Sequence, residues 1–502
     1  MPSIKKMIIL FGSALFLTSG TLLVWKLRMS KFDGDSDPGI YVHPGSQPNS
    51  TDPLEFDSLV HHIFQRPLIS TLVSEHRVGG LTGVIATSWR SENNYREWFF
   101  KIRTGMTFSS GAPITSKSIA LSLNRMTLLL KRRGSHDGLL EFLEGFKDID
   151  RADELIDGIS FRENELVLRF SRPVENALHY LSFGQYAIVS MEDYNPQSGV
   201  WQAAKRVNSS GPYEIEKWDE EQIAIKLRKD YPPQLIHPLP FKRFNFVWSA
   251  KFKDKISIRE GHEDFPLADK YSFLGSTKSS IRYVRILGFQ NSLNPLKDKE
   301  LRIRFRERLF SKLKNNGFPV TKSFLPLAIN GVRESIHSDE TNDSKFSGKL
   351  RIYKYPAFVP LYQRLPDLIA EVGKELGLET EFANPPATEV KSSLNDPTKE
   401  PAVHLSVAGT SIIIDRPKED LRFMVKSKEG IRLPDPTGRL SKLVDSEDYD
   451  VQSFNDILDD DALVWPIMHT AGGIWVKPEL IDASLLNPEP PPTDLSLLGR
   501  IK

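Results

Sequence analysis

One apolar run near the N-terminus constrains the chain more than any other feature. Lys5 and Lys6 precede an almost unbroken apolar stretch from Met7 to Trp25, and no second run of that length follows. At about 1.5 Å per helical residue, such a run nearly spans a bilayer core about 30 Å thick. We therefore expect one N-terminal hydrophobic helix, contact with a membrane through residues 7–25, and export of everything that follows.

A secretory signal peptide begins in the same way, with basic residues followed by an apolar stretch. Thr18-Ser19-Gly20 offers a cleavage site, but the apolar run continues beyond it from Thr21 to Trp25. Residues 1–28 are therefore expected to form an uncleaved signal anchor, with a cleaved signal peptide as the alternative.

Charge and cysteine content exclude several classes of function. The formal net charge is +1, so the composition does not indicate the strongly basic surface that binds nucleic acid. The chain contains no cysteine, so disulfides, thiolate metal sites, iron–sulfur clusters and a cysteine nucleophile are excluded. We expect no nucleic-acid partner.

Residues 29–51 are rich in Gly, Pro, Ser and Asp and are expected to form a flexible tether. Beyond them, strand-like and helix-like segments alternate, which indicates an α/β protein. Alternating apolar residues predict strands at 165–170 and 222–228. A helical stripe at 361–376 between strand-like segments 350–355 and 378–382 predicts a βαβ unit with parallel, adjacent strands.

Two charged clusters resemble binding sites, but each has a simpler structural explanation. A predicted helix at 299–314 carries Arg302, Arg304, Arg306 and Arg308, but acidic residues are interleaved, so a solvated face is expected. Asp459-Asp460-Asp461 lacks the alternating oxygen ligands and central Gly of a calcium loop. We expect this acidic cluster at the N-terminus of a helix.

The motifs of the commonest enzymes are missing. The sequence has no G-x-S-x-G elbow, no H-E-x-x-H zinc helix and no G-x-x-x-x-G-K-[ST] phosphate loop. The adjacent histidines His61 and His62 would point away from each other on a helix or strand. We expect no enzymatic activity, no metal site and no cofactor.

Several segments occur in an order that is typical of one family. Asp52-Pro53-Leu54 is followed by the stretch from Ile69 to Leu72. Residues 81–126 read LTGVIATSW and then REWFFKIRTGMTFSSGAPITSKSIALSLNRM. NSSGPYE at 208–214 precedes Lys217-Trp218, GFQN at 288–291 precedes DKELRIRFRERL at 298–309, and DRPKEDLRF occupies 415–423. Together these segments resemble the family 5 extracellular solute-binding proteins of ABC importers, which include oligopeptide, dipeptide and nickel receptors.

The segment with the strongest resemblance also has a physical interpretation. Trp98 to Arg103 alternates as a strand, a turn follows, and Phe108 is expected to begin a second short strand. Thr115 is placed to cap a helix, with Ser118 at the third helical position. Ser116 and Ser118 replace the Ala and Asp that are usual in the family.

The resemblance implies an α/β, bilobed periplasmic-binding-protein-like fold of type II, in the large peptide-binding class, with an added subdomain in lobe I. The expected organisation is a signal segment at 1–28, a tether at 29–51, lobe I at 52–75, its added subdomain at 76–195, more of lobe I at 196–264, lobe II at 265–452, a return to lobe I at 453–486 and a Pro-rich tail at 487–502.

The resemblance further implies a solute-binding protein that encloses a peptide or another small solute between its lobes and delivers it to an ABC transporter permease. An Asp in the segment that matches DRPKEDLRF pairs with the ligand's α-ammonium group in peptide binders of the family; Asp415 occupies this position and Asp420 is the fallback. Residue 412 is Ile where the family has Trp. Asn291 and Trp218 are further candidates because they lie in matching motifs.

The resemblance also implies a bacterial, periplasmic or extracytoplasmic protein, anchored to the inner membrane if residues 1–28 are retained, and we expect a monomer. The alternative is a membrane-tethered sensor or scaffold that keeps the fold but has lost transport.

Overall fold

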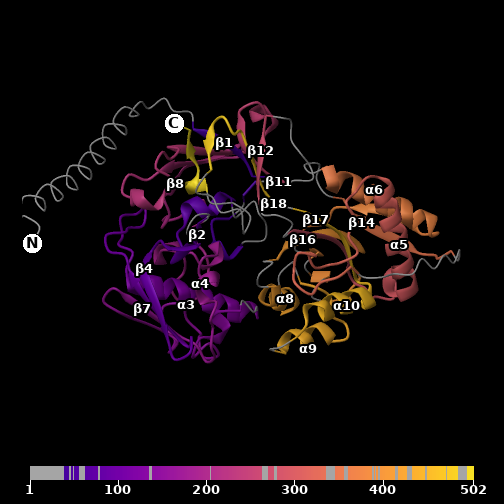
Figure 1. Cartoon of the computed structure of the whole chain (residues 1–502), viewed down its shortest axis with the longest axis horizontal. Helices are drawn as coiled ribbons and strands as arrows, with labels where there is room; N and C mark the ends of the chain where they lie inside the picture. The colour runs from indigo at the N-terminus through magenta and orange to yellow at the C-terminus, as the bar shows by residue number, and fades with distance from the viewer. Residues whose placement is uncertain are drawn as a thin grey trace, which may run out of the picture.

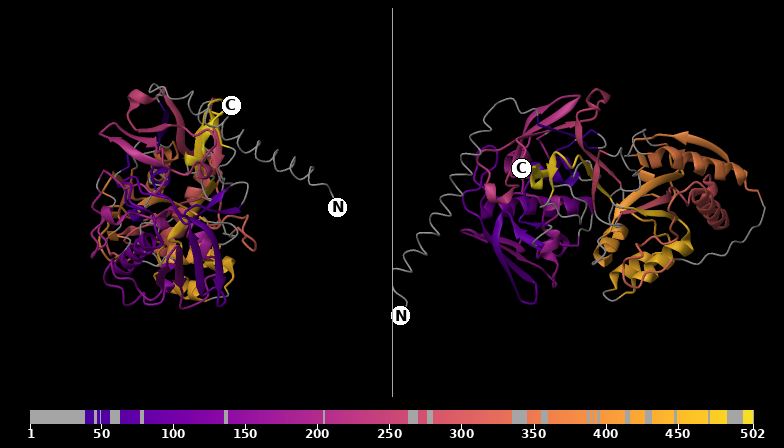
Figure 2. Two further views of the ribbon diagram at one scale, coloured as in Figure 1. Left: turned by 90° about the vertical axis from the view of Figure 1, so that its left-hand side faces the viewer. Right: turned by 45° about the horizontal axis from the view of Figure 1, so that its top comes forward.

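The chain forms two bodies that lie side by side (Figures 1 and 2). This computed structural model describes residues 39–501 apart from 45–46, 49, 56–62, 77–79, 135–137, 204, 263–269, 276–279, 335–344, 355–359, 387–388, 391, 394–395, 413–416, 427–431, 447–448, 471 and 484–494. Lobe I contains the described residues of 39–275 and 472–501, and lobe II those of 280–470. The predicted N-terminal hydrophobic helix lies outside the described residues.

A seven-stranded sheet organises lobe I. Its strands run in the spatial order β12 (Ser272–Gly275), β18 (Gly472–Val476), β11 (Ile256–His262), β1 (Ile40–His43), β10 (Arg243–Val247), β9 (Gln222–Leu227) and β8 (Tyr213–Trp218). The strand predicted at 222–228 is confirmed as β9. The first strand of the chain, β1, lies inside the sheet and is parallel to both of its neighbours, β10 and β11.

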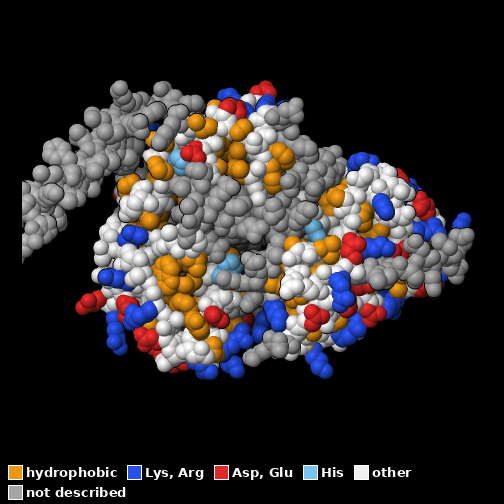
Figure 3. Space-filling view, in the orientation of Figure 1, with side chains coloured by type: hydrophobic (Ala, Val, Ile, Leu, Met, Phe, Trp, Pro, Cys, Tyr) orange, Lys and Arg blue, Asp and Glu red, His pale blue; other side chains and the backbone are white. Residues whose placement is uncertain are grey.

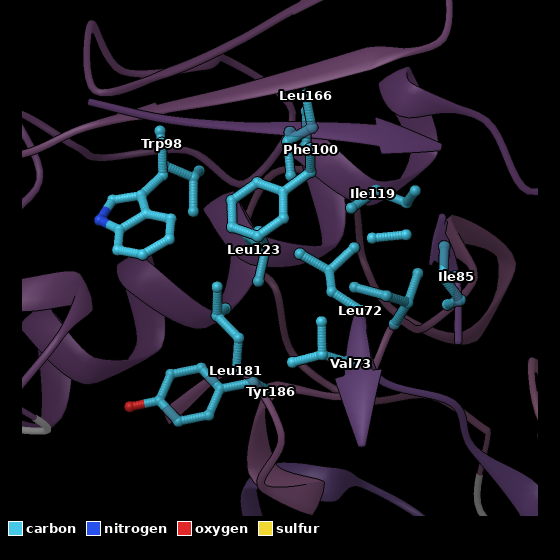
Figure 4. Packing of buried hydrophobic residues seen from close by; sticks show 14 of the residues in the cluster. Leu72, Val73, Ile85, Trp98, Phe100, Ile119, Leu123, Leu166, Leu181 and Tyr186 are labelled. Atoms are coloured by element: carbon cyan, nitrogen blue, oxygen red, sulfur yellow. The ribbon is translucent and has the colours of Figure 1, made fainter. Parts of the chain in front are cut away.

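The subdomain of lobe I has its own sheet and core. Its strands are ordered β4 (Ala86–Glu92), β5 (Glu97–Ile102), β7 (Glu165–Arg169) and β6 (Ile159–Arg162), and a hairpin of β2 (Val73–His76) and β3 (Gly80–Gly83) lies before them in the chain. The predicted strands at 98–103 and 165–170 are confirmed. Side chains of β5, β7 and helix α3 (Ser116–Arg133) meet in a packed apolar core (Figure 4).

The predicted cap of α3 is confirmed. The Thr115 hydroxyl accepts a hydrogen bond from the Ser118 backbone N–H at 3.2 Å, and the Thr115 N–H donates to the Ser118 hydroxyl at 2.8 Å. The second short strand predicted at Phe108 is wrong. Only an isolated bridge between Thr107 and Pro113 forms there, because the chain turns back at Gly111, whose φ of +85° suits a glycine.

Lobe II contains a five-stranded sheet with helices on both faces (Figure 1). The strand order is β15 (Glu379–Ala383), β14 (Lys349–Tyr353), β16 (Leu405–Ser411), β13 (Ser280–Ile286) and β17 (Val464–Thr470). Strands β14 and β15 pair in parallel on either side of α6 (Pro360–Glu375) in the chain, so the predicted βαβ unit is confirmed.

The two faces of this sheet bury separate cores. Helices α5 (Lys299–Asn315) and α6 cover the face that carries Val284 and Ile286. Helices α8 (Pro417–Lys426), α9 (Arg439–Asp445) and α10 (Val451–Asp461) cover the face that carries Ile281 and Tyr283.

The acidic cluster Asp459–Asp461 ends α10, so its predicted place at a helix N-terminus is wrong. Helix α10 begins at Asp450, whose carboxylate accepts from the Ser453 N–H, and runs to Asp461. Carboxylates at a helix C-terminus face the negative end of its dipole. Cations compensate here: Lys299 and Arg439 pair with Asp460 at 3.0 and 2.7 Å.

The predicted solvated arginine face of α5 is wrong for two of its four members. Arg302 and Arg306 are 8% and 3% exposed. Their guanidinium groups donate to the backbone oxygens of Asp461 and Asp459, so they cap the C-terminus of α10.

The chain passes between the lobes at two adjacent points. It leaves lobe I after β12 and enters β13, and it returns from β17 to β18. Gly275 pairs with Gly473 on the lobe I side, and Ser280 pairs with Thr470 on the lobe II side. The ends of the two connections therefore lie next to each other on both lobes. The domain limits expected from the sequence remain predictions.

The chain ends in the core of lobe I. Leu495, Leu497 and Leu498 are buried there, and β20 (Gly499–Arg500) pairs with β19 (Ile481–Asp482). The Pro-rich residues 487–493 lie outside the described residues, but the residues after them pack because they are apolar.

Candidate functional site

One end of the lobe II sheet faces lobe I. Ser280, at the start of β13, pairs with Ser411 at the end of β16 and with Thr470 at the end of β17. Because the chain crosses to lobe I at Ser280 and Thr470, the end of β16 also lies at this boundary. Residues 413–416 continue from that end, and α8 follows at Pro417.

Asp415 falls within residues 413–416 and lies outside the described residues. Asp420 lies on the first turns of α8 and is half-buried. Before the gap, Ile412 is 1% exposed and packs in the same core as Leu421 and Met424 of α8. The Ile at position 412 therefore serves the core of lobe II.

Asn291 and Trp218 lie away from the boundary between the lobes. Asn291 follows the far end of β13, where its side chain donates to the Thr398 oxygen at 2.8 Å and accepts from the Leu293 N–H at 2.9 Å. Trp218 ends β8, at the sheet edge opposite β12, and its ring packs edge-on against Phe64 at 5.4 Å. Asp420 is four residues beyond the gap at 413–416, whereas Asn291 and Trp218 lie in other parts of the two lobes.

A direct contact joins the lobes at a place that sequence reasoning missed. The guanidinium carbon of Arg422, on α8 of lobe II, lies 5.6 Å from the ring centroid of Phe142 in lobe I. Arg172, also in lobe I, lies over the same ring at 3.5 Å. Arg422 lies within the family segment at 415–423, but no motif marks Phe142 or Arg172, and 280 positions of sequence separate Phe142 from Arg422.

Two buried titratable groups have displaced pKa values, and each has a structural explanation. Burial raises the pKa of Asp193 in lobe I to about 6, although its carboxylate accepts two hydrogen bonds from Asn208. Burial and the nearby Arg351 lower the pKa of His404 in lobe II to about 4. Burial within a single lobe is the main cause of each shift.

Two kinds of site are absent from the described residues. No described helix is both long enough and apolar enough to cross a membrane. No cluster of three or more His, Cys, Asp or Glu in the same part of the chain could hold a metal ion. On the face drawn in Figure 3, Lys and Arg side chains are interspersed with Asp and Glu over both lobes.

Residues 80–248 match the family model described as bacterial extracellular solute-binding proteins, family 5 Middle. The match covers about a third of the chain. The matched residues include the four-stranded sheet of the subdomain and strands β8 to β10 of lobe I. The resemblance stated from the sequence motifs is thereby confirmed.

Known family 5 relatives are distant in sequence and close in fold. The chain is 23% identical over 154 residues to the probable D,D-dipeptide-binding periplasmic protein DdpA of Escherichia coli (strain K12). That alignment covers 30% of this chain and 27% of DdpA, so the chain spans about a quarter of the length of this curated relative. The predicted bilobed α/β fold is confirmed by superposition on solved structures.

Two of the solved structures differ in how well this chain superposes on them. Haemophilus influenzae OppA in complex with RPPGFSPFR gives a TM-score of 0.70 at 15% identity, covering 93% of this chain and 100% of OppA. The unliganded open form of MppA, a periplasmic murein tripeptide binding protein, gives 0.56 at 15% identity, covering 93% of this chain and 98% of MppA. At equal identity, the chain superposes better on the peptide complex.

The segments that carry the family resemblance meet in lobe I and bind one another. The Ser109 N–H donates to the Ser209 oxygen, and the Ser209 N–H donates to the Ser109 hydroxyl, both at 2.9 Å. Arg228 is 5% exposed and donates to the backbone oxygens of Ser209, Gly211 and Thr107. These contacts therefore fix the subdomain to the main sheet of lobe I.

Proposed function

We propose that this chain is the extracytoplasmic solute-binding protein of an ABC importer and that it encloses a peptide or peptide-like ligand between its two lobes. One observation carries the proposal: two sheets joined by two adjacent connections, with one end of β16 at the boundary. Two connections whose ends are adjacent can act as a hinge about which the lobes open and close. The similarity to DdpA and to peptide-bound OppA supports a peptide as the ligand class.

We further propose that Asp415 binds the ligand's α-ammonium group, with Asp420 as the second candidate. Support comes from the place of the segment, between the boundary end of β16 and the start of α8. A carboxylate that is enclosed on closure of the lobes needs a cation, because an unpaired buried charge costs several kcal/mol. Asn291 and Trp218 are weaker proposals, since hydrogen bonds and packing within their own lobes already explain them.

The proposed location is the extracytoplasmic side of a membrane. Residues 7–25 act as an anchor if residues 1–28 are retained, and as a signal peptide if they are removed. The proposed partner is an ABC permease, and the protein acts as a monomer. The alternative of a tethered sensor or scaffold without transport receives no support from the relatives.

Intrinsic tryptophan fluorescence and thermal unfolding, measured against pools of random di- to pentapeptides, test the proposal. A spectral change together with a rise in melting temperature for at least one pool is expected. Mass spectrometry of small molecules that co-purify with the protein would then identify the natural ligand. A protein that responds to no pool and carries no peptide would refute the peptide assignment.

The role of Asp415 needs its own variant. Asp415→Ala should weaken binding of a responding peptide at least about tenfold, because truncating one partner of an enclosed charge pair costs roughly 2–5 kcal/mol. Asp367→Ala is the matched control, because Asp367 is an exposed carboxylate on α6 of the same lobe. Equal affinity of the Asp415 variant and the control would remove Asp415 from the site.

A further inference from the structure

We infer that Phe142 and Arg422 form a contact that holds the two lobes together and so sets the affinity for every ligand. The inference rests on the proposed function, because it concerns the closure by which a ligand would be enclosed. Phe142 belongs to lobe I, where it packs against the core of the subdomain, and Arg422 belongs to α8 of lobe II. Their contact therefore exists only while the lobes are together.

The lobe I half of the contact is rigidly held. The backbone oxygen of Phe142 accepts hydrogen bonds from the N–H and the hydroxyl of Ser171, at 2.8 and 3.0 Å. The next residue, Leu143, bridges Phe170 just beyond β7. Arg172 lies over the ring at 3.5 Å. The ring is therefore fixed to the four-stranded sheet before the lobes meet.

The lobe II half is also fixed, by the packing of α8. Leu421, Met424 and Val425 are buried in the core of lobe II. Arg422 projects from another side of the helix, with its side chain 27% exposed and 4.0 Å from Asp445. The Nε atom of Arg422 is buried without a hydrogen-bond partner among the described residues. The aromatic face of Phe142 attracts the guanidinium group, whose carbon lies 5.6 Å from the ring centroid.

The position of Arg422 on α8 couples this contact to the proposed ligand segment. Helix α8 starts at Pro417, directly after residues 413–416, and Arg422 follows five residues later, about 7.5 Å along the helix. A ligand that draws the start of α8 toward lobe I would bring Arg422 to Phe142. Conversely, the Phe142–Arg422 contact favours the closed form before any ligand arrives.

The Phe142–Arg422 contact should change ligand affinity, because it shifts the equilibrium between the open and closed forms of the protein. A ligand that binds the closed form has an apparent affinity proportional to the closed fraction of the free protein. A cation–π contact at a half-buried site corresponds to a change of about three- to tenfold in the closed-to-open ratio. Loss of the contact should therefore weaken all ligands by the same factor and leave their ranking unchanged.

The test measures closure in the ligand-free protein, so it does not depend on knowing the ligand. The chain contains no cysteine, so Lys117→Cys on α3 and Lys374→Cys on α6 supply the only two labelling sites for fluorescence energy transfer. Both lysines are exposed, one in each lobe. In this background, Phe142→Leu and Arg422→Gln should each lower the closed-to-open ratio about three- to tenfold, and the double variant should lower it no further than either single one.

Four further variants distinguish loss of the Phe142–Arg422 contact from general destabilisation of the fold. Phe142→Trp and Arg422→Lys keep an aromatic ring and a cation, and should retain most of the closed population. Phe161→Leu removes an exposed ring of the same subdomain, and Asp445→Asn removes the carboxylate beside Arg422; neither should shift the ratio. Thermal unfolding verifies that each variant is folded.

An unchanged distance distribution in Phe142→Leu and Arg422→Gln would overturn the inference, as would an equal shift in Phe161→Leu. A protein that binds no peptide but shows the expected shifts would refute the proposed ligand class and leave the closure contact standing.

Discussion

The carboxylate of Asp52 and the guanidinium group of Arg125 form a two-bond ion pair inside lobe I. The Nη1–Oδ1 and Nη2–Oδ2 distances are 3.1 and 2.7 Å, and the two side chains are 4% or less exposed. Arg125 also donates from Nε to the Gly199 oxygen at 2.8 Å and lies about 5 Å from the ring centroid of Tyr194. The pair ties the first motif of the chain to α3 of the subdomain.

Removing one member of this pair should destabilise lobe I strongly. Asp52→Asn or Arg125→Met leaves a buried charge without its partner, a change that costs about 3–5 kcal/mol. Urea unfolding followed by circular dichroism measures the loss. Lys251→Gln, which removes one side of the exposed pair with Glu221, is the control and should cost less than about 1 kcal/mol. Similar losses in both cases would contradict the assigned role.

Gly211 should tolerate no side chain. A Cβ atom there would lie 2.6 Å from the Ile69 nitrogen and 2.8 Å from the Pro67 oxygen, both of which are backbone atoms. Gly211→Ala should therefore cost about 1–3 kcal/mol or more through overpacking. Gly317→Ala, where φ is +79° but nothing lies within 4 Å, tests backbone strain alone and should cost about 1 kcal/mol. Comparison of the melting temperatures of the two variants separates the cost of overpacking from the cost of backbone strain.

His404 should make lobe II sensitive to acid. Its pKa is about 4 in the folded protein and 6.5 in a model peptide, so the unfolded chain binds more protons between these values. Its contribution to stability is present above pH 6.5 and is lost as the pH falls toward 4, by about 2–3 kcal/mol in total. His404→Asn should flatten this part of the stability–pH curve, measured by urea unfolding; an unaltered slope would contradict the assignment.

Asp193 should act in the opposite direction in lobe I. Its pKa is about 6 when folded and 3.8 when unfolded, so the folded protein binds more protons between these values. Its favourable contribution is present below pH 3.8 and is lost as the pH rises through 6. Relative to the wild type, Asp193→Asn should therefore gain stability above pH 6. A variant whose stability difference from the wild type is independent of pH between 4 and 7 would disprove the raised pKa.

Features set by neighbouring residues were predictable from the sequence. The alternation at 222–228, the spacing of Thr115 and Ser118, and the stripe of apolar residues at 361–376 each determine structure within one or two elements. The family motifs added the bilobed fold, because the residues that bind the subdomain to the main sheet, such as Ser209 and Gly211, lie within those motifs.

Features that depend on distant packing were not predictable. The sequence Asp459–Asp461 does not itself indicate whether it begins or ends a helix. Its place at the C-terminus of α10 depends on cations from other helices, namely Arg302, Arg306 and Arg439. Likewise, Phe142 and Arg422 meet only because two separately folded bodies are brought together. Arg422 lies within the family motif at 415–423, but neither that motif nor local periodicity indicates that it meets Phe142.

The place of β18 between β11 and β12 determines the order in which the protein can be completed. Ribosomes and export channels deliver a chain from its N-terminus, so every strand of lobe II, ending at Thr470, emerges before Gly472–Val476 does. Strand β12 pairs with β18 and with no other described strand. The seven-stranded sheet of lobe I therefore cannot be completed until β18 has been synthesised, although β11 and β12, which flank it, are made before lobe II.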